Sequence, residues 1–400
     1  MIIAQGNLTK DALAGRIAVI TGAGGGIGFE AARALIWLGC RAVIAEIEAR
    51  NGRRAAQALC AEFGPGAALF VRTDVGDESS VKNLARRAEK AYGRVDIVIN
   101  NATVAPLGAV KDTAIETWDA SYRVNLRGPV LLARAFIPGM AARDWGVFAC
   151  VSSTGGPYMG AYESLKAAQV HLGATLNEEL AGANVAAFTI GPGFVPTQTA
   201  ASSIPKLAAL MGKSEEEMLE LLKPHTISVE AAGAGFAAAV AMAPRYRGQE
   251  ISSMQALIDA GIDLAAPERT AGELSLTSEQ WERALALCRS VRATLAKESA
   301  GWKDRSIFEQ QWLVRTFRQK ASLPVDDWLR SLAQMEAALQ KQDAAALGAI
   351  KAPLDRLAAY YAHLHDLAKG YVRDPAQREE QLKIVRNWQD EVEQLHALLR

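Results

Sequence analysis

Residues 17–28 read IAVITGAGGGIG: four apolar residues, a threonine and a glycine-rich turn. The apolar run predicts a short buried strand, and the residues from Ile27 onward predict the start of a helix. Glycines permit the sharp turn between them and let backbone N–H groups approach a phosphate at the positive end of the helix dipole. The stretch therefore predicts a binding site for the pyrophosphate of a dinucleotide, formed by Gly22, Gly26, Ile27 and Gly28.

A carboxylate follows the next apolar run, Ala42–Ala45, at Glu46. Such an acid at a strand end can bind the ribose 2′-hydroxyl of NAD and repels the 2′-phosphate of NADP. Residues 23–25 and Ile47, where an arginine could hold that phosphate, are uncharged. We therefore expect NAD as the cofactor. The alternative, a structural turn followed by a surface glutamate, does not account for the agreement of strand, turn, helix and acid.

Bulk composition narrows the class of protein. The 400 residues are 50% hydrophobic and carry 44 basic and 44 acidic side chains, so the net charge is zero. A chain of this length predicts two or three domains, and its charge balance argues against nucleic acid or an anionic membrane as partner. The four cysteines form no C-x-x-C pair, and no apolar run is long enough to span a bilayer. We expect a cytoplasmic protein with reduced, packing thiols.

Short apolar strands alternate with helical patterns from about Leu13 to Ile262. This alternation predicts an α/β domain, residues 1–265, with a Rossmann-type doubly wound parallel sheet of about seven strands and helices on both faces. Ligands then bind at the carboxyl ends of the strands. The expected strands are 17–20, 42–45, 68–71, 95–99, 147–151, 185–190 and 250–252, and the expected helices are 27–38, 49–62, 79–92, 115–141, 161–181 and 229–242.

The β signal stops beyond Pro267, and residues 275–400 predict a smaller all-α domain. Thr277 and Gln280 form a capping-box pattern, followed by apolar residues at helical spacing from Trp281. Further helices are expected over 304–319, from Val325, from Leu354 to just before Gly370, and from Asp374-Pro375. This region contains five of the eight tryptophans, enough for its own core or for docking onto a partner protein.

Tyr162 and Lys166 lie at i and i+4, on one face of a predicted helix. A nearby ammonium favours the phenolate, so the pair predicts a tyrosine whose pKa is lowered toward neutrality. Ser153 ends the fifth predicted strand, where its hydroxyl can hydrogen-bond a substrate carbonyl. Taken alone, the Y-x-x-x-K spacing is common by chance, and a surface pair is the alternative.

Three further positions have both a functional and a structural interpretation. Asn125 lies inside a predicted helix. It is either an active-site group or only the residue at which the helix kinks. Asp74 follows the third strand, where it can bind the adenine amine or cap the next segment. Asn101 and Ala102 follow the fourth strand and are expected beside the adenosine.

In this order, the motifs resemble those of the classical short-chain dehydrogenase/reductase family over residues 13–262. The matching residues are Gly22, Gly26, Ile27, Gly28, Asp74, Val75, Asn100, Asn101, Ala102, Asn125, Ser153, Tyr162, Lys166, Pro192 and Gly193. The resemblance implies an oxidoreductase that interconverts a secondary alcohol and a ketone. It also implies a homo-oligomer, a dimer or tetramer.

The resemblance also implies roles for single residues. Tyr162 would be the general acid/base, Lys166 would bind the nicotinamide ribose and lower the pKa of the tyrosine, and Ser153 would polarise the substrate oxygen. Asn125 would hold a water in the proton relay. The segment Pro192–Thr197 would grip the nicotinamide carboxamide through Gly193, Val195 and Thr197.

The sequence departs from the family pattern at several points. Only nine positions separate Ser153 from Tyr162, so the intervening loop is short and Ser152 is an alternative to Ser153. Thr103 stands where a glycine is usual, and Leu165 replaces the common serine before the lysine. The last strand runs into residues 254–261 instead of an Asp-Gly-Gly tail, which puts the usual tetramer in question.

Residues 198–226 correspond to a substrate lid. Their apolar content favours a bulky, largely apolar substrate, although most of these side chains pack the lid itself. Lys206, Lys213 and Lys223 could meet an anionic tail such as that of an acyl-CoA, or be solvated. The five histidines lack the spacing of metal ligands, so no metal is expected. The alternative function is a catalytically weak dinucleotide-binding scaffold that works through residues 275–400.

Overall fold

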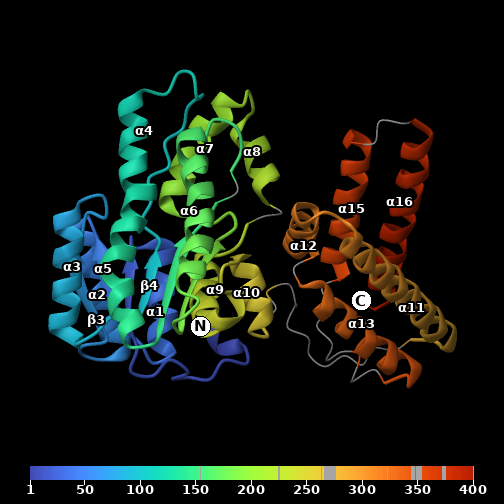
Figure 1. The fold of residues 1–400 in the computed structure, drawn as a ribbon, viewed down its shortest axis with the longest axis horizontal. Coiled ribbons are helices and arrows are strands. Elements are labelled where there is room, and N and C mark those ends of the chain that lie inside the picture. Colours follow the sequence, from blue (N-terminus) through green and yellow to red (C-terminus); the bar gives the residue numbers. More distant parts are fainter. Residues whose placement is uncertain are drawn as a thin grey trace. The chain divides into compact units, whose positions relative to one another are not determined.

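The computed structural model describes residues 1–153, 155–223, 226–262, 264, 276–321, 323–343, 347, 354–371 and 375–399. The chain divides into two compact units, Met1–Ala265 and Ala266–Arg400. The first unit contains the sheet and the helices around it, and the described part of the second unit is helical (Figure 1).

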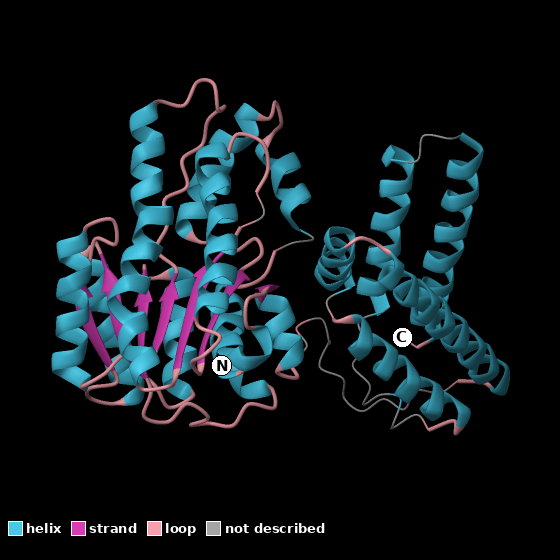
Figure 2. Cartoon of the chain, in the orientation of Figure 1, coloured by secondary structure: helices cyan, strands magenta, loops and turns pink. Residues whose placement is uncertain are grey.

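Seven parallel strands form one sheet in the order β3-β2-β1-β4-β5-β6-β7 (Figure 2). All seven predicted strands are confirmed, with ends that differ by two residues at most. Because the strand order reverses between β1 and β4, the crevice for a ligand opens at the carboxyl ends of these strands. The strands are β1 Ile17–Thr21, β2 Arg41–Glu46, β3 Ala68–Arg72, β4 Ile97–Asn100, β5 Gly146–Val151, β6 Val185–Gly191 and β7 Glu250–Ser252.

Helices cover both faces of the sheet and bury its apolar side chains. Helices α1, α2, α9 and α10 pack on one face, and α3, α5 and α6 pack on the other. The fold prediction of a doubly wound sheet is confirmed. These helices span α1 Gly26–Trp37, α2 Ala49–Phe63, α3 Glu78–Tyr92, α5 Gly128–Ala142, α6 Gly160–Glu179, α9 Val229–Ala241 and α10 Ser253–Asp259, with a short 3-10 helix, η4, at Ala243–Tyr246.

The predicted helix over 115–141 contains a π-helical turn. Helix α4 (Ile115–Tyr122) leads into the π turn η2 (Arg123–Arg127), and α5 continues from Gly128. Such insertions are frequent at functional sites. Asn125 lies in this turn, and its side chain is buried. The backbone is therefore irregular at Asn125, as the helix-kink interpretation predicts.

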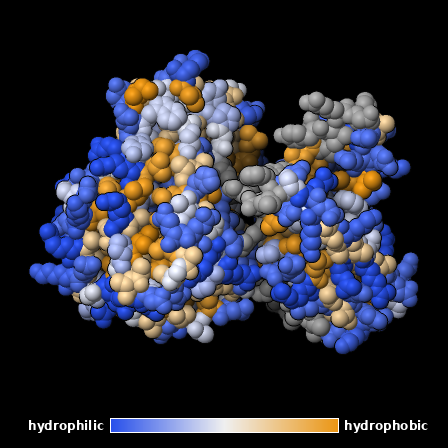
Figure 3. Space-filling view, viewed as in Figure 1, coloured by the Kyte–Doolittle hydropathy of each residue, from blue (hydrophilic) through white to orange (hydrophobic). Residues whose placement is uncertain are grey.

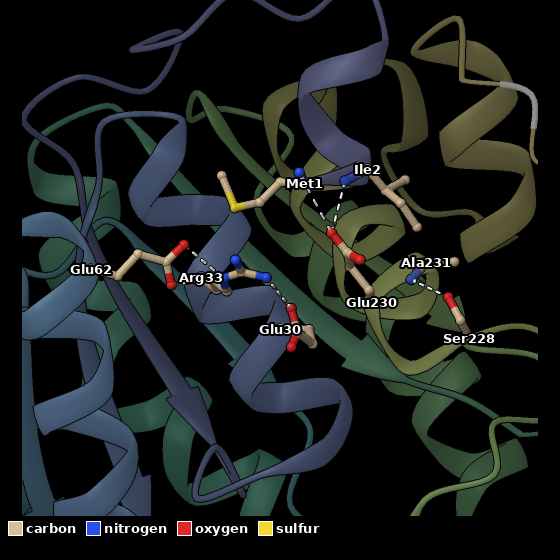
Figure 4. A network of polar contacts seen from close by, with 8 residues as sticks. All are labelled: Met1, Ile2, Glu30, Arg33, Glu62, Ser228, Glu230 and Ala231. Atoms are coloured by element: carbon tan, nitrogen blue, oxygen red, sulfur yellow. Dashed lines mark hydrogen bonds and ion pairs between the residues drawn. The ribbon is translucent and has the colours of Figure 1, made fainter.

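The amino-terminal residues are attached to α9, beside the start of the sheet (Figure 4). Residues Ile2–Gln5 form the 3-10 helix η1, and the N–H of Ile2 donates to Glu230 Oε1 at 2.9 Å. Next to them, Arg33 of α1 pairs with Glu30 and with Glu62 of α2. These contacts connect η1 to α9 and α1 to α2, and the second pair stabilises the helix whose amino end forms the predicted phosphate site.

The second unit has a hydrophobic core of its own. Thr277 and Gln280 form the predicted capping box, and Trp281, Cys288 and Leu295 are buried along the next helix as predicted. The prediction that a helix stops before Gly370 is wrong, because α15 continues to Tyr371. Asp374, with which the last helix was predicted to begin, lies outside the described residues. The elements are α11 Ser278–Gly301, η5 Trp302–Asp304, α12 Ile307–Ala321, α13 Val325–Gln340, α15 Leu354–Tyr371 and α16 Pro375–Leu398.

All four cysteines are free thiols. Burial raises the pKa values of Cys40, Cys150 and Cys288 to about 12, so these three are unreactive core groups. None of the described helices combines the length and the apolar composition that a bilayer crossing requires.

Candidate active site

The glycine-rich turn has no room for a side chain at Gly22, Gly24 or Gly28. Gly22 has φ +65°, and a Cβ atom there would lie 2.9 Å from Ala102 Cα. A Cβ atom at Gly28 would lie 2.7 Å from Asn101 Nδ2. Helix α1 begins at Gly26, which also has a positive φ, so its first N–H groups lie at the turn. These features fit a pyrophosphate bound at a helix N-terminus.

The residues after β4 hold this turn in place. Asn101 Nδ2 donates to the carbonyl oxygens of Thr21 at 2.9 Å and Gly22 at 3.2 Å. The hydroxyl of Thr21 accepts the N–H groups of Asn101 and Ala102, each at 3.0 Å. The polar groups of Asn101 and Ala102 thus brace the turn, a role that the sequence pattern did not indicate.

Glu46, at the end of β2, is held beside the same turn. Its Oε2 atom accepts the N–H of Gly24 at 3.1 Å, and its Oε1 atom accepts the N–H of Glu48 at 3.0 Å. A Cβ atom at Gly24 would lie 2.8 Å from Oε2, so the glycine allows this close approach. The negative charge therefore lies between the phosphate site and the end of β2, where the adenosine ribose of a dinucleotide would bind.

Asp74 and Val75 follow β3. Asp74 Oδ1 accepts the N–H of Gly76 at 2.8 Å, and its carboxylate lies 3.8 Å from the Arg123 guanidinium. Val75 is buried against Gly128 at the start of α5. The Asp74 side chain thus closes a local turn, whereas the side chain that caps the next helix, α3, is that of Asp77, which accepts the N–H of Ser80.

The segment after β6 lies against the glycine-rich turn. Gly193 has φ +80°, a conformation that favours glycine, and Val195 is buried. Thr197 caps helix α7 by accepting the N–H of Ala200 at 3.2 Å, and its methyl group lies 3.4 Å from the position of a Cβ at Gly26. Residues 192–197 are therefore placed to cover a bound dinucleotide.

Lys166 is fully buried at the end of β5. Its Nζ atom donates to the carbonyl oxygen of Val151 at 2.8 Å and lies 5.6 Å from the centroid of the Tyr162 ring. Burial lowers the pKa of this ammonium from 10.5 to about 8. The predicted pairing of the two side chains on one face of α6 is thus present.

The prediction that Lys166 lowers the pKa of Tyr162 is wrong for this structure. Burial of the phenol raises the pKa above its ordinary value of 10, and hydrogen bonding to Ser153 and Thr103 opposes this rise only in part. The negative charge of Glu163 raises the pKa further. The reason is that the ammonium is directed to a backbone carbonyl while the phenol is desolvated next to a carboxylate.

The structure distinguishes between the two serines after β5. The buried Ser152 hydroxyl faces the backbone of Gly191, where an added Cβ would lie 3.2 Å from it. Ser153 reaches the Tyr162 hydroxyl and donates to Glu163 Oε1 at 2.7 Å. Ser153 is therefore the serine that shares the site with the tyrosine.

Asn125 is the centre of a buried hydrogen-bond network. Its Oδ1 atom accepts the Thr103 hydroxyl at 2.7 Å, and its Nδ2 atom donates to Ser121 Oγ at 2.9 Å. Its backbone carbonyl, which lies four residues before Pro129 and so lacks a helical N–H partner, accepts Gln169 Nε2 at 2.5 Å. Gln169 in turn accepts Asn100 Nδ2 at 3.0 Å. Since Thr103 is also near enough to Tyr162 to oppose the rise of its pKa, the network extends from the end of β4 to the side of the tyrosine.

Three residues of this site were not found as functional candidates from the sequence: Thr103, Glu163 and Gln169. Thr103 was noted only as a departure from the family pattern. A threonine in place of glycine was the one available signal, because it adds a hydroxyl beside Asn125. The sequence contained no pattern that pointed to Glu163 or Gln169. Their contacts are with residues of other elements, and only the folded chain brings these elements together.

The predicted lid contains helices α7 (Gln198–Leu210) and α8 (Glu215–Leu222). Its apolar side chains pack mainly against one another: Ile204, Ala208 and Met218 are buried, with Phe194, Leu207, Met211 and Leu222 around them. The packing alternative thus explains most of them. Leu219 and Leu221 remain exposed.

Among the described residues, no three His, Cys, Asp or Glu side chains gather as metal ligands would. His225, one of the five histidines considered, lies outside the described residues.

Comparisons with known proteins identify the family. Residues 16–208 match the model of the short chain dehydrogenase family. An uncharacterized oxidoreductase of Thermotoga maritima is 35% identical over 46% of this chain and 73% of its own length. Human dehydrogenase/reductase SDR family member 4 is 30% identical over 55% of this chain and 78% of its own length. The chain belongs to the short-chain dehydrogenase/reductase family.

A solved structure agrees with this assignment. L-sorbose reductase from Gluconobacter frateurii, complexed with NADPH and L-sorbose, covers 61% of this chain and 97% of its own, with a TM-score of 0.56 and 25% identity. The family binds a nicotinamide dinucleotide, and the glycine turn, the free N-terminus of α1 and the covering segment 192–197 fit such a group.

Proposed function

We propose that this oxidoreductase interconverts a secondary alcohol and a ketone with NAD(H). The observation that supports this most is the gathering of Ser153, Tyr162 and Lys166 at the carboxyl end of β5, in the same unit and at the same sheet edge as the dinucleotide turn.

Each of these side chains has a defined task. When bound, the nicotinamide accepts a hydride from the alcohol carbon or returns it to the ketone carbon. Tyr162 takes the hydroxyl proton during oxidation and gives it back during reduction. Ser153 donates to the reacting oxygen as negative charge develops there. Lys166 holds the nicotinamide ribose.

Asn125 acts on the proton path. In the proposed reaction, the Thr103 hydroxyl connects Tyr162 to the Asn125 side chain, and Gln169 holds the Asn125 carbonyl. Carboxamide side chains do not pass protons on, so the task of Asn125 is to hold the Thr103 hydroxyl beside the tyrosine, and a substitution at Asn125 would displace this hydroxyl.

The preference for NAD over NADP rests on Glu46. Its carboxylate is fixed by two backbone N–H groups and needs no rearrangement to accept a ribose hydroxyl. A 2′-phosphate at the same place would bring two negative charges together without an arginine to neutralise them. Family membership alone does not decide this, because the similar L-sorbose reductase binds NADPH.

We propose a bulky, largely apolar substrate. The support for this is the exposure of Leu219 and Leu221 of α8, because the other apolar side chains of the lid pack against one another. An acyl-CoA has less support, since Lys223 already pairs with Glu220 at 3.1 Å.

A homo-oligomer is the assembly we propose. Ile115 and Tyr122 of α4 and Val130 of α5 are exposed large apolar residues on successive helices. Figure 3 shows apolar surface over the helices that cover this face of the first unit. Covering such a surface by a second copy would remove it from water. Residues 275–400 then serve assembly or bind a partner protein.

The test is a screen of NAD- and NADP-dependent turnover on a panel of secondary alcohols and ketones, with the full chain and with residues 1–264. Turnover of at least one pair with NAD, retained in the shorter chain, supports the enzyme. No turnover together with a stoichiometric partner bound through residues 275–400 would favour the scaffold instead.

A further inference from the structure

The side chain of Glu163, directly after the candidate acid/base tyrosine, enters the same site. Its Oε1 atom accepts the hydroxyl hydrogen of Ser153 at 2.7 Å. Its negative charge is close enough to raise the pKa values of both Tyr162 and Lys166. Glu163 is only half-buried, so part of its side chain is open to a ligand. The site therefore contains a carboxylate next to the serine that is proposed to bind the reacting oxygen.

The short loop after β5 makes room for this carboxylate. A Cβ atom at Gly155 would lie 2.3 Å from Glu163 Oε1, so a side chain at this position would push the carboxyl group away. Because the loop has few residues, the start of α6 lies close to the end of β5. Loop length and glycine together allow the contact between Glu163 and Ser153.

The hydrogen bond from Ser153 to Glu163 uses the hydroxyl hydrogen that Ser153 needs for the substrate oxygen. A serine hydroxyl has a single hydrogen to donate. While Ser153 donates it to Glu163, it cannot donate it to a substrate oxygen. A ketone oxygen only accepts, so a plain ketone must compete with an ionised carboxylate for the same hydrogen. A substrate that supplies a donor to Glu163 removes this competition.

We propose that Glu163 is a specificity-determining residue that accepts a hydrogen bond from a hydroxyl group on the carbon next to the reacting carbon of the substrate. Binding of this hydroxyl releases Ser153, which then donates to the reacting oxygen. The proposal rests on the proposed function. It concerns one hydroxyl group only, so the rest of the substrate can still be apolar.

The geometry matches such a substrate. Ser153 Oγ and Glu163 Oε1 are separated by one hydrogen-bond length. Oxygen atoms on neighbouring carbons of a hydroxyketone have a similar spacing, about 3 Å, so one oxygen can bind Ser153 while the other binds Glu163. The serine and the carboxylate thus form a two-point site for adjacent oxygens.

The test uses pairs of ketones that differ by one hydroxyl on the adjacent carbon: butanone with acetoin, and acetophenone with phenacyl alcohol. For each pair, kcat and KM are measured in the NADH-dependent direction for the wild-type enzyme, Glu163→Ala and Glu163→Gln. Glu178→Gln, which changes an exposed glutamate on the same helix, is the matched control.

We expect the wild-type enzyme to prefer the hydroxyketone by about 10-fold or more in kcat/KM, since a hydrogen bond to a charged group is worth about 1.5 kcal/mol or more. In Glu163→Ala this ratio falls toward one, because the hydroxyl of the hydroxyketone loses its acceptor whereas the plain ketone loses no contact. Glu163→Gln gives an intermediate ratio, and Glu178→Gln leaves the ratio unchanged.

Other outcomes would overturn the proposal in distinguishable ways. If the wild-type enzyme reacts with both members of a pair and the ratio is the same in Glu163→Ala, Glu163 does not select the substrate. If Glu163→Ala reduces kcat equally for both members, Glu163 only positions Ser153. If no ketone in the set reacts in the wild-type enzyme, the proposed function fails first, and this proposal with it.

Discussion

Replacing Glu298 with glutamine should make the stability of the helical unit less dependent on pH. Glu298 lies on α11, and one of its carboxyl oxygens accepts the hydroxyl of Tyr360, which is fully buried in that unit. Its other oxygen, Oε2, is shielded from solvent. Burial raises the pKa of this carboxyl from 4.5 to about 7, and the hydrogen bond from Tyr360 opposes the rise.

The sign and the size of the effect follow from this shift. Below pH 4.5 the carboxyl is protonated in both the folded and the unfolded state, and its ionisation has no effect on stability. Between pH 4.5 and 7 only the unfolded state ionises, so the folded state loses stability as the pH rises. The complete loss is about 3 kcal/mol above pH 7, because each factor of ten in the ionisation constant corresponds to about 1.4 kcal/mol.

A glutamine at position 298 keeps an oxygen acceptor for Tyr360 and has no charge. Glu298→Gln should therefore be more stable than wild type at pH 8 by up to about 3 kcal/mol, with a smaller difference at pH 5. The assay is urea unfolding of the full chain, followed by tryptophan fluorescence, because Trp302 packs on Phe317 beside Tyr360. Glu282→Gln, an exposed site on the same helix, is the control. A difference between Glu298→Gln and wild type that is equal at both pH values would refute the reasoning.

Three further predictions concern the first unit. Glu46→Ala should reduce the preference for NAD over NADP by about 10-fold or more, because it removes both the hydrogen bond to the ribose of NAD and the repulsion of the 2′-phosphate of NADP. The preference is measured as the ratio of kcat/KM for the two cofactors. An unchanged ratio counts against the role assigned to Glu46. Gly28→Ala places a Cβ 2.7 Å from Asn101 Nδ2, so NAD affinity measured by calorimetry should fall strongly, whereas Gly25→Ala, where the space is open, should have little effect. Gln169→Leu leaves two buried partners unpaired and should cost about 2 kcal/mol or more in the free energy of unfolding, together with slower turnover; wild-type stability would show that the buried network is unimportant.

The sheet could be predicted from the sequence because its signals are local. Strands β1 to β6 each contain an apolar run bounded by polar or glycine residues, and parallel strands buried on both faces produce such runs. The glycine turn was equally predictable: Gly22 and Gly28 are required by contacts with the adjacent loop after β4. The capping box at Thr277 depends on residues three positions apart and was also predicted correctly.

The site was less predictable because its details depend on contacts between distant segments. The spacing of Tyr162 and Lys166 indicated a shared helix face, but it contained no information on desolvation. Burial and the charge of Glu163 raise the pKa of the tyrosine instead of lowering it. In a regular helix the Asn125 carbonyl would face Pro129, which has no N–H, so this carbonyl needs another partner; helical periodicity does not show that Gln169 supplies it.

The account depends most directly on Tyr162 as the proton donor and acceptor. The decisive measurement compares Tyr162→Phe with wild type in two assays: turnover of the best alcohol or ketone, and NADH binding by fluorescence titration. Because acid–base catalysis contributes about 100-fold to 10,000-fold, we predict a loss of at least 100-fold in kcat with NADH affinity nearly unchanged. Turnover within a few-fold of wild type, with NADH bound equally well, would contradict the account.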